Sequence, residues 1–206
     1  AGNRGVYPSF DGSAAEVRIA ADGGVTVFSG EGEIGCGATT IWAQIAAEVL
    51  GIDVGGVKVA EVDSDYSPFG LGAYASRVTV IGGNAVRAAA MDARRQLLEV
   101  ASEMYKTPAA ELTIQDNKII HLTSGEELGD FAAVATHACY RSGGSVIVGR
   151  GSFVPNNVTI ADPKTKYGNI APSYSFGCQV AEVEVDRETG KVKVLNFLAI
   201  QDLGRA

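Results

Sequence analysis

The sequence predicts an α+β fold: mixed, mainly antiparallel sheets built from hairpins, packed by one long and two shorter helices. Three pairs of apolar, β-prone segments flank strong turn signals at residues 22–24, 116–117 and 188–190. Three other segments repeat apolar residues at helical spacing. Strands and helices do not alternate regularly, as they would in a parallel α/β sheet, so hairpin pairing dominates.

The elements follow in order along the chain. Residues 14–34 form a hairpin, and a helix runs from about Thr39 to Leu50, where Gly51 ends it. A strand lies within residues 55–65, and a long helix covers about 76–106, with an alanine-rich middle that predicts close packing. A second hairpin, a helix near 128–141, a strand at 145–154, a polar loop at 156–175 and a third hairpin at 179–200 complete the chain.

The overall composition excludes several function classes. A formal charge of −7 without a basic stripe argues against nucleic-acid binding, and no apolar run approaches the roughly 20 residues of a membrane span. Three cysteines without a CxxC pair, together with two histidines, argue against zinc and favour a reducing cytoplasm. The 26 glycines are close to twice the usual share of roughly 7%, which predicts tight turns or backbone close to a ligand.

A glycine-rich stretch leads into the first helix. Gly30, Gly32, Gly35 and Gly37 fall within eight positions and enclose Cys36. Such a loop presents backbone N–H groups to an anion at a helix N-terminus, although the spacing matches neither a Walker loop nor GxGxxG. Taken alone, the stretch fits an anion site and a plain strand-to-helix connection equally well.

A second loop of the same kind, residues 70–83, precedes the long helix, with Ser76 and Arg77 at its mouth. A hydroxyl and a guanidinium at a helix N-terminus suit a phosphate. The simpler alternative is that Ser76 caps the helix and Arg77 is solvated. Two such loops favour one extended ligand, and a cofactor with a pyrophosphate would fit both.

Other polar residues are open to simpler interpretations. A helix N-terminus lowers the pKa of a thiol, so Cys36 could be reactive, although no histidine lies near it in sequence. We expect the remaining candidates to be structural: acidic residues near the loops, both histidines, two core cysteines and a solvated arginine pair, namely Glu33, Asp63, Asp65, His121, His137, Cys139, Cys178, Arg94 and Arg95.

Three stretches together resemble the molybdenum-binding large subunit of the xanthine oxidase family. They are "GEGEIGCGATTIWAQIAAEVLGI", "VAEVDSDYSPFGLGAYASRVTVIGGNAVRAAA" and "FGCQVAEVEVDRETGKVKVLNFLAIQDLGRA". They resemble the family's E-M-G-Q-G segment, its G-T-Y-(A/G)-S-R loop and its strand pair ending in D-x-G-R-A-I-N-P, in the same order. Within the family, "PFGLGAYASRVT" is most similar to the 4-hydroxybenzoyl-CoA reductase branch.

The resemblance implies that both glycine loops wrap a molybdenum–molybdopterin cytosine dinucleotide, a pterin that carries a pyrophosphate. It also implies iron–sulfur and flavin (FAD) centres on partner subunits, and a small aromatic, aldehyde or CoA-thioester substrate. It places no catalytic and no metal-ligating residue in this chain. The cofactor-binding residues that it implies are Gly35, Cys36 and Gly37 in the first loop and Ala73, Ser76, Arg77 and Val78 in the second.

The sequence departs from the family at three of these positions. Cys36 stands where members often carry a glutamine, and Ala73 and Val78 stand where a threonine and a serine often contribute hydroxyls. Each absent hydrogen bond would cost roughly 1 kcal/mol or more. The family's catalytic glutamate lies in a G-x-G-E loop beyond the last matching stretch.

We therefore expect residues 1–206 to be a single domain, a fragment of the second molybdenum-cofactor-binding domain of a longer subunit, and inert alone. The leading hypothesis is a cofactor-binding segment of a molybdenum-dependent oxidoreductase. The second is a non-catalytic binding or assembly module that has lost the cofactor. The third is a redox or acyl-transfer enzyme centred on Cys36.

Overall fold

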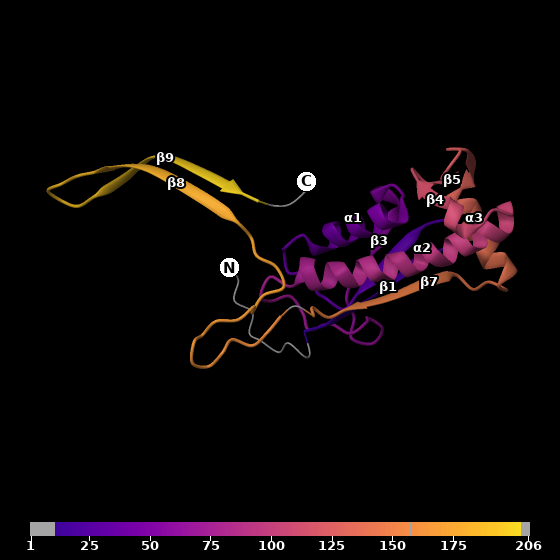
Figure 1. The fold of residues 1–206 in the computed structure, drawn as a ribbon, viewed down its shortest axis with the longest axis horizontal. Helices are drawn as coiled ribbons and strands as arrows, with labels where there is room; N and C mark the ends of the chain where they lie inside the picture. The colour runs from indigo at the N-terminus through magenta and orange to yellow at the C-terminus, as the bar shows by residue number, and fades with distance from the viewer. Residues whose placement is uncertain (1–10, 157, 203–206) are drawn as a thin grey trace.

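The computed structural model describes residues 11–156 and 158–202, and it confirms the predicted class. Three α-helices, one of them long, pack with mainly antiparallel sheets (Figure 1). In this part of the chain, no helix combines the length and the apolar character that crossing a membrane requires.

The helices begin and end close to the predicted positions. The α-helices are α1 (Ala38–Leu50), α2 (Gly83–Tyr105) and α3 (Phe131–Arg141). Gly51 ends α1 in the left-handed conformation, as predicted. A π-helical turn, Val78–Gly82, precedes α2 and replaces the first part of the long helix that the sequence predicts. Residues 128–130, expected to begin α3, belong to a strand instead.

The strands of the described residues form three sheets. A four-stranded sheet has the order β3-β2-β1-β7, a three-stranded sheet the order β4-β5-β6, and β8 and β9 form a separate pair. All pairs are antiparallel except β2 with β3. The bounds are β1 (Ser13–Ile19), β2 (Val25–Ser29), β3 (Val57–Val59), β4 (Leu112–Gln115), β5 (Lys118–His121), β6 (Glu127–Asp130), β7 (Ile147–Phe153), β8 (Gly177–Val185) and β9 (Val192–Gln201).

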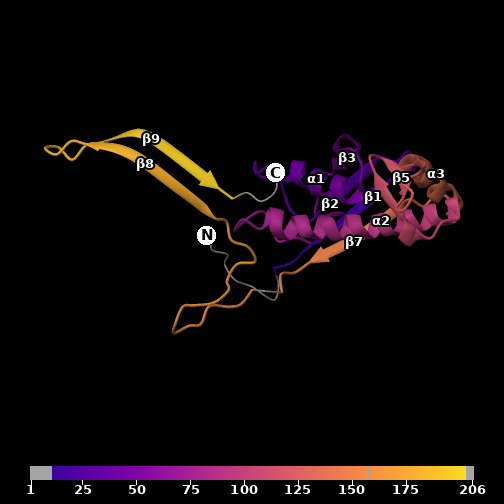
Figure 2. The same ribbon diagram turned by 45° about the horizontal axis from the view of Figure 1, so that its top comes forward.

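The core lies between α2 and the sheet strands β1 and β7, with α1 beside α2 (Figures 1 and 2). The alanine-rich face of α2 lies directly on the backbone of β7. A Cβ at Gly149 would stand 2.2 Å from the carbonyl oxygen of Ala89, and one at Gly151 would stand 2.2 Å from its nitrogen. These glycines therefore permit the close packing that the alanines predict, and the packing fixes the start of α2 against the sheet.

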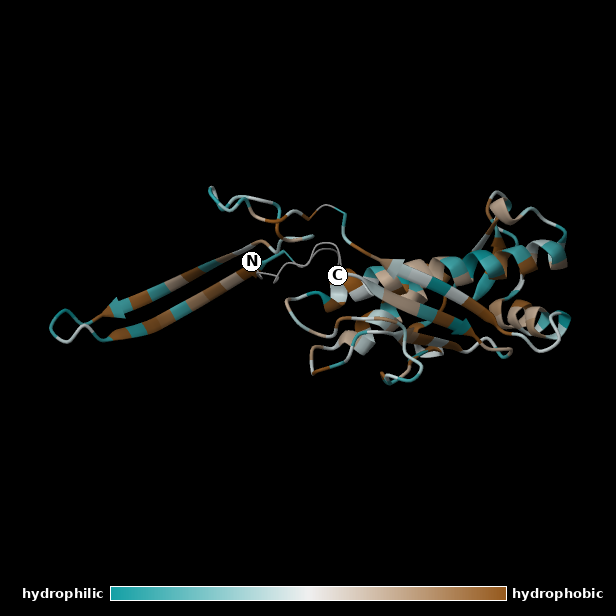
Figure 3. Ribbon diagram, turned by 90° about the horizontal axis from the view of Figure 1, so that it is seen from below, coloured by the Kyte–Doolittle hydropathy of each residue, from teal (hydrophilic) through white to brown (hydrophobic). Residues whose placement is uncertain are grey.

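The hairpin β8–β9 extends away from the other sheets (Figures 1 and 3). All its residues are exposed, including Cys178, which the sequence analysis placed in the core. Strand alternation and the observed register place one row of apolar side chains on a single face. This apolar face comprises Ala181, Val183, Val185, Val192, Val194 and Phe197.

Candidate cofactor site

The first glycine loop, residues 30–37, turns sharply into α1. Gly35 and Gly37 adopt positive φ angles of 95° and 76°, which favour glycine. The turn directs several backbone N–H groups toward one point, and the Glu33 carboxylate occupies that point. Its Oε1 accepts from Gly35 and Cys36 at 2.6 Å each and from Gly37 at 3.2 Å, and its Oε2 accepts from Thr39 at 3.3 Å.

The Glu33 carboxylate is held in its charged form by these contacts. Partial desolvation raises its pKa, but hydrogen bonds from the backbone of Thr39, Gly35 and Cys36 and from the Cys36 thiol outweigh that effect. The pKa of Glu33 therefore falls from 4.5 to about 2. The loop thus binds an anion, as its glycines predict, but the anion is a side chain of the same chain.

The second glycine loop, predicted at residues 70–83, ends at residue 76 because Val78–Gly82 is helical, and together with the turn before it the loop spans residues 64–76. Its last two residues, Ala75 (φ 48°) and Ser76 (φ 56°), are left-handed. The π-helical turn begins two residues later, and its N-terminus has no side-chain cap. The alternative in which Ser76 caps the helix is therefore wrong. Ser76 and Thr79 are both exposed, and neither hydroxyl has a hydrogen-bond partner among the residues that the structure describes.

The two loops line one cavity of about 270 Å³. Four of the predicted site residues, Cys36, Ala73, Ser76 and Val78, meet there, although 36 residues separate Cys36 from Ala73 in the sequence. Gly35 and Gly37 lie beside Cys36, and open space faces the position of a Cβ at each. The complete lining is Ile34, Cys36, Ala38, Ala73, Tyr74, Ala75, Ser76, Val78 and Thr79.

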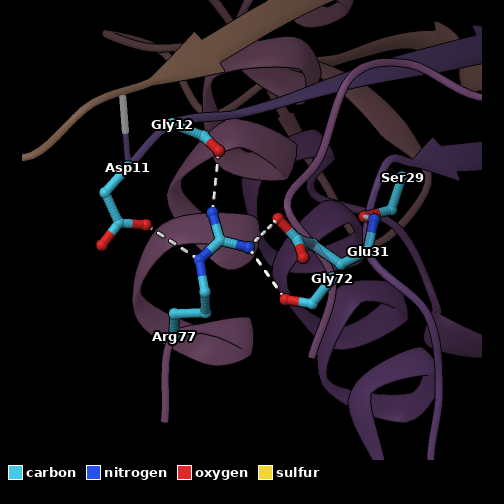
Figure 4. Close-up of polar contacts among 6 residues, drawn as sticks. All are labelled: Asp11, Gly12, Ser29, Glu31, Gly72 and Arg77. Atoms are coloured by element: carbon cyan, nitrogen blue, oxygen red, sulfur yellow. Dashed lines mark hydrogen bonds and ion pairs between the residues drawn. The ribbon is translucent and has the colours of Figure 1, made fainter. Parts of the chain in front are cut away.

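Arg77, the remaining predicted site residue, does not line this cavity, and its guanidinium points toward Asp11, Gly12, Glu31 and Gly72 (Figure 4). Its side chain is fully buried, so the alternative of a solvated Arg77 is wrong. Nε donates to Asp11 at 2.9 Å, Nη2 to the carbonyl oxygen of Gly12 at 2.7 Å, and Nη1 to that of Gly72 at 3.0 Å. Nη1 also pairs with Glu31. The direct phosphate contact expected of Arg77 would require its guanidinium to leave these partners.

Glu31 and Asp11 complete a buried ionic cluster that the sequence analysis missed. Glu31 is fully buried, and its backbone N–H donates to the Ser29 hydroxyl at 3.1 Å (Figure 4). Its second carboxylate oxygen and Trp42 Nε1 have no hydrogen-bond partner within the described chain. The sequence signal was an acidic residue inside one glycine loop and an arginine directly after the other, but nothing local showed that the two meet.

The other polar candidates lie outside the cavity. His121 contacts Glu111 and Ser124, and His137 is exposed on α3, so no imidazole lines the cavity beside Cys36. Arg94 is half-buried rather than solvated, because it donates to Val49 and Thr113, whereas Arg95 is exposed as predicted. Across residues 11–156 and 158–202, no group of three or more acidic, histidine or cysteine side chains could hold a metal ion.

The family of the chain follows from a comparison with known protein families. A family model described as "Molybdopterin cofactor-binding domain" matches residues 2–206. The chain belongs to this family. The family is that of the xanthine dehydrogenase and carbon monoxide dehydrogenase type of molybdenum enzyme, so the coarser part of the sequence-based resemblance is confirmed.

Individual relatives agree with this assignment. The chain is 31% identical over 199 residues to a probable hypoxanthine oxidase of Escherichia coli K12, covering 96% of this chain and 19% of the relative. It is 30% identical over 197 residues to a putative xanthine dehydrogenase molybdenum-binding subunit of the same organism, covering 93% and 24%. The chain thus spans about a fifth to a quarter of the relatives' length.

A solved structure shows the same fold. Quinoline 2-oxidoreductase from Pseudomonas putida 86 matches with a TM-score of 0.76 and 26% identity, covering 92% of this chain and 23% of that one. Its agreement in architecture confirms the mixed fold with one long helix.

Proposed function

We propose that the cavity between the two glycine loops binds part of a molybdopterin cofactor, in its cytosine dinucleotide form, as one domain of a molybdenum-dependent oxidoreductase. The observation that carries this proposal is the convergence of Cys36 with Ala73 and Ser76 on one cavity. This convergence supports the proposal, because the chain belongs to the molybdopterin cofactor-binding family and the resemblance implies that both loops hold the cofactor.

The residues of the cavity fit one portion of such a group. The volume of about 270 Å³ lies just below the usual range of about 300–1,000 Å³ for ligand pockets, so a single ring system or a phosphate fits and a whole dinucleotide does not. Ser76 and Thr79 offer unpaired hydroxyls. Open space beside the backbone at Gly35, Gly37 and Gly72 allows close approach of a ligand.

The proposed division of labour follows from these side chains. Ser76, Thr79 and the Tyr74 hydroxyl would donate to or accept from polar groups of the cofactor, while Ile34 and Val78 would contact its apolar surface. The hydroxyls of Ser76 and Thr79 would offset the donors missing at Ala73 and Val78. When bound, the molybdenum centre would supply the redox chemistry, and this chain would hold and orient it.

We also propose that residues 1–206 form one domain of a longer subunit. The apolar face of the β8–β9 hairpin supports this, because an isolated two-stranded hairpin is marginally stable in water at best. We expect another part of the subunit to cover that face. Such a subunit would work with iron–sulfur and flavin partner subunits, since several relatives are named as the large subunit or chain of an enzyme.

The substrate and the location are finer proposals. The segment "PFGLGAYASRVT" supports an activity like that of 4-hydroxybenzoyl-CoA reductase, and a small aromatic, aldehyde or CoA-thioester substrate follows from the family. The three free thiols are compatible with a reducing cytoplasm. Inactivity of residues 1–206 alone also stays a prediction.

One observation favours the second candidate, a non-catalytic assembly module on the same scaffold. The amides of Gly35, Cys36 and Gly37, which would otherwise face an anionic ligand, are already bound by Glu33. Together with the missing donors at Ala73 and Val78, this reduces the polar contacts open to a cofactor.

Cofactor analysis separates the two candidates. The chain, with the flanking sequence that its gene encodes, is purified from cells that make the cofactor, and released pterin, cytidine monophosphate and molybdenum are measured per chain. The proposal predicts near-stoichiometric amounts of all three. Their absence, while a control molybdenum enzyme from the same cells is loaded, would favour the assembly module.

A further inference from the structure

We propose that Arg77 is a positioning residue: it sets the spacing of the two glycine loops from behind the cavity and does not touch the ligand. The nature of that ligand rests on the function proposed above, whereas the spacing itself is a property of this chain. The Arg77 guanidinium donates four hydrogen bonds (Figure 4).

The partners of Arg77 come from three segments far apart in the sequence. Glu31 belongs to the first loop and Gly72 to the second, and Asp11 and Gly12 lead into β1. Four of the five guanidinium N–H groups are used. One side chain therefore ties both loops to the end of the central sheet.

A guanidinium suits this task better than any other side chain. Its planar fork reaches several acceptors in fixed directions, whereas a lysine ammonium is a compact charge with three donors on a flexible stem. The cluster is buried, since Arg77 and Glu31 are fully inaccessible and Asp11 is 5% exposed. Water cannot easily replace a lost donor there, so the geometry depends on Arg77 itself.

Glu31 depends on Arg77 in turn. One of its carboxylate oxygens accepts from Arg77, and the other has no partner within the described residues. Without the guanidinium, a buried carboxylate would lose its counter-charge and would have to move toward water. Because Glu31 lies in the first loop, that movement would carry the loop with it.

The two loops also touch directly, so a change in one is transmitted to the other. A Cβ built at Gly30 would lie 2.4 Å from the carbonyl group of Phe69, and one at Gly70 would lie 2.2 Å from the carbonyl oxygen of Gly30. Arg77 is moreover the chain neighbour of Ser76 and Val78, which both line the cavity. Anchoring Arg77 therefore fixes the direction of the cavity wall on either side of it.

The test compares Arg77→Lys with Arg94→Lys in the full chain. Arg94 is a matched control because it is half-buried and also joins two elements, through Val49 and Thr113, but it lies outside the cavity. Amide hydrogen exchange is followed in peptides from both loops, from β1 and from α2, and bound pterin is measured per chain. We expect the amides of both loops to exchange at least tenfold faster in R77K, while those of β1 and α2 exchange at the wild-type rate. R77K should also retain at least tenfold less pterin. R94K should change neither quantity.

Each outcome decides between named alternatives. If R77K loses pterin while loop exchange stays at the wild-type rate, Arg77 contacts the ligand directly and the positioning role is wrong. If wild-type protein holds no pterin, the proposed function fails, and loop exchange alone decides the role of Arg77.

A second pair of variants applies if R77K does not fold. Glu31→Gln keeps an oxygen that can accept from Arg77, and Glu31→Ala does not. Positioning predicts wild-type loop exchange in E31Q and at least tenfold faster exchange in E31A. Equal exchange in the two variants would overturn it.

Discussion

The contact between the glycine loops offers a sharp test, because two glycines two positions apart in the same loop have opposite surroundings. A Cβ at Gly30 would lie 2.4 Å from the carbonyl carbon and oxygen of Phe69 and 2.5 Å from the carbonyl oxygen of Pro68, whereas nothing lies within 4 Å of one at Gly32. Neither position has a positive φ. Gly30→Ala therefore forces the two glycine loops apart, whereas the methyl group added by Gly32→Ala has no atom within 4 Å to displace.

The size of the effect follows from the distances. Non-bonded atoms at optimal separation lie about 3.5–4.0 Å apart, so the backbone of the two loops must separate by about 1 Å in G30A. The obstructing atoms are backbone, which cannot rotate away. Overpacking of this kind costs about 1–3 kcal/mol, and we expect G30A to lose that amount of unfolding free energy while G32A stays within about 0.5 kcal/mol of wild type.

Urea unfolding measures the stability of both variants, and the amount of pterin bound per chain measures how well the cavity still holds the cofactor. We expect G30A to lose pterin as well as stability, because the loops that separate are the two walls of the cavity. If G30A were as stable as G32A and bound as much pterin, the loops would not depend on their spacing, and the account of the site would be refuted.

Four further predictions follow from single side chains. Because folding lowers the pKa of Glu33 from 4.5 to about 2, the ionised carboxylate orders the first glycine loop above pH 4.5, and this order is lost as the pH falls toward 2. NMR of the loop amides should show this transition, and E33Q should abolish it. Cys36→Gln should raise pterin retention about fivefold if it restores one hydrogen bond of about 1 kcal/mol, and an unchanged value in equilibrium dialysis would contradict this. Lys106→Gly should raise the free energy of unfolding in urea by about 0.5–1 kcal/mol, because Lys106 ends α2 at φ 53°, and an unchanged value would contradict this. Gly151→Ala should lower the free energy of unfolding by about 3 kcal/mol, since its Cβ would meet the backbone of α2, and an unchanged value would disprove that contact.

Local signals in the sequence predicted much of the fold. The turns at residues 22–24 and 116–117 join strands as expected, and positive φ angles at Asp116 and Asn117 suit the two-residue hairpin. Gly51 ends α1, and the alanines of α2 pack closely as predicted. Each of these features depends on residues that are near one another in the chain.

The errors arose where distant segments decide the outcome. The strand β6 was missed because it gains its partner only when β5 lies beside it, and the parallel pairing of β2 with β3 was equally invisible. Arg77 was predicted to bind the cofactor or, in the simpler alternative, to be solvated, and its burial was not foreseen because its acidic partners, Asp11 and Glu31, lie 66 and 46 residues away. Glu33 is different, since a carboxylate two residues before a glycine turn is a local signal that could have been recognised.

The most direct test of the cavity is the alkylation rate of Cys36 in cofactor-loaded and cofactor-free protein. Cys36 lines the cavity and Cys178 lies on the hairpin, and both thiols are exposed, so Cys178 serves as the internal control. The account predicts that bound cofactor slows alkylation of Cys36 at least tenfold relative to its effect on Cys178. Loaded protein in which Cys36 reacts as fast as in the cofactor-free form would contradict it, because the cofactor would then lie elsewhere.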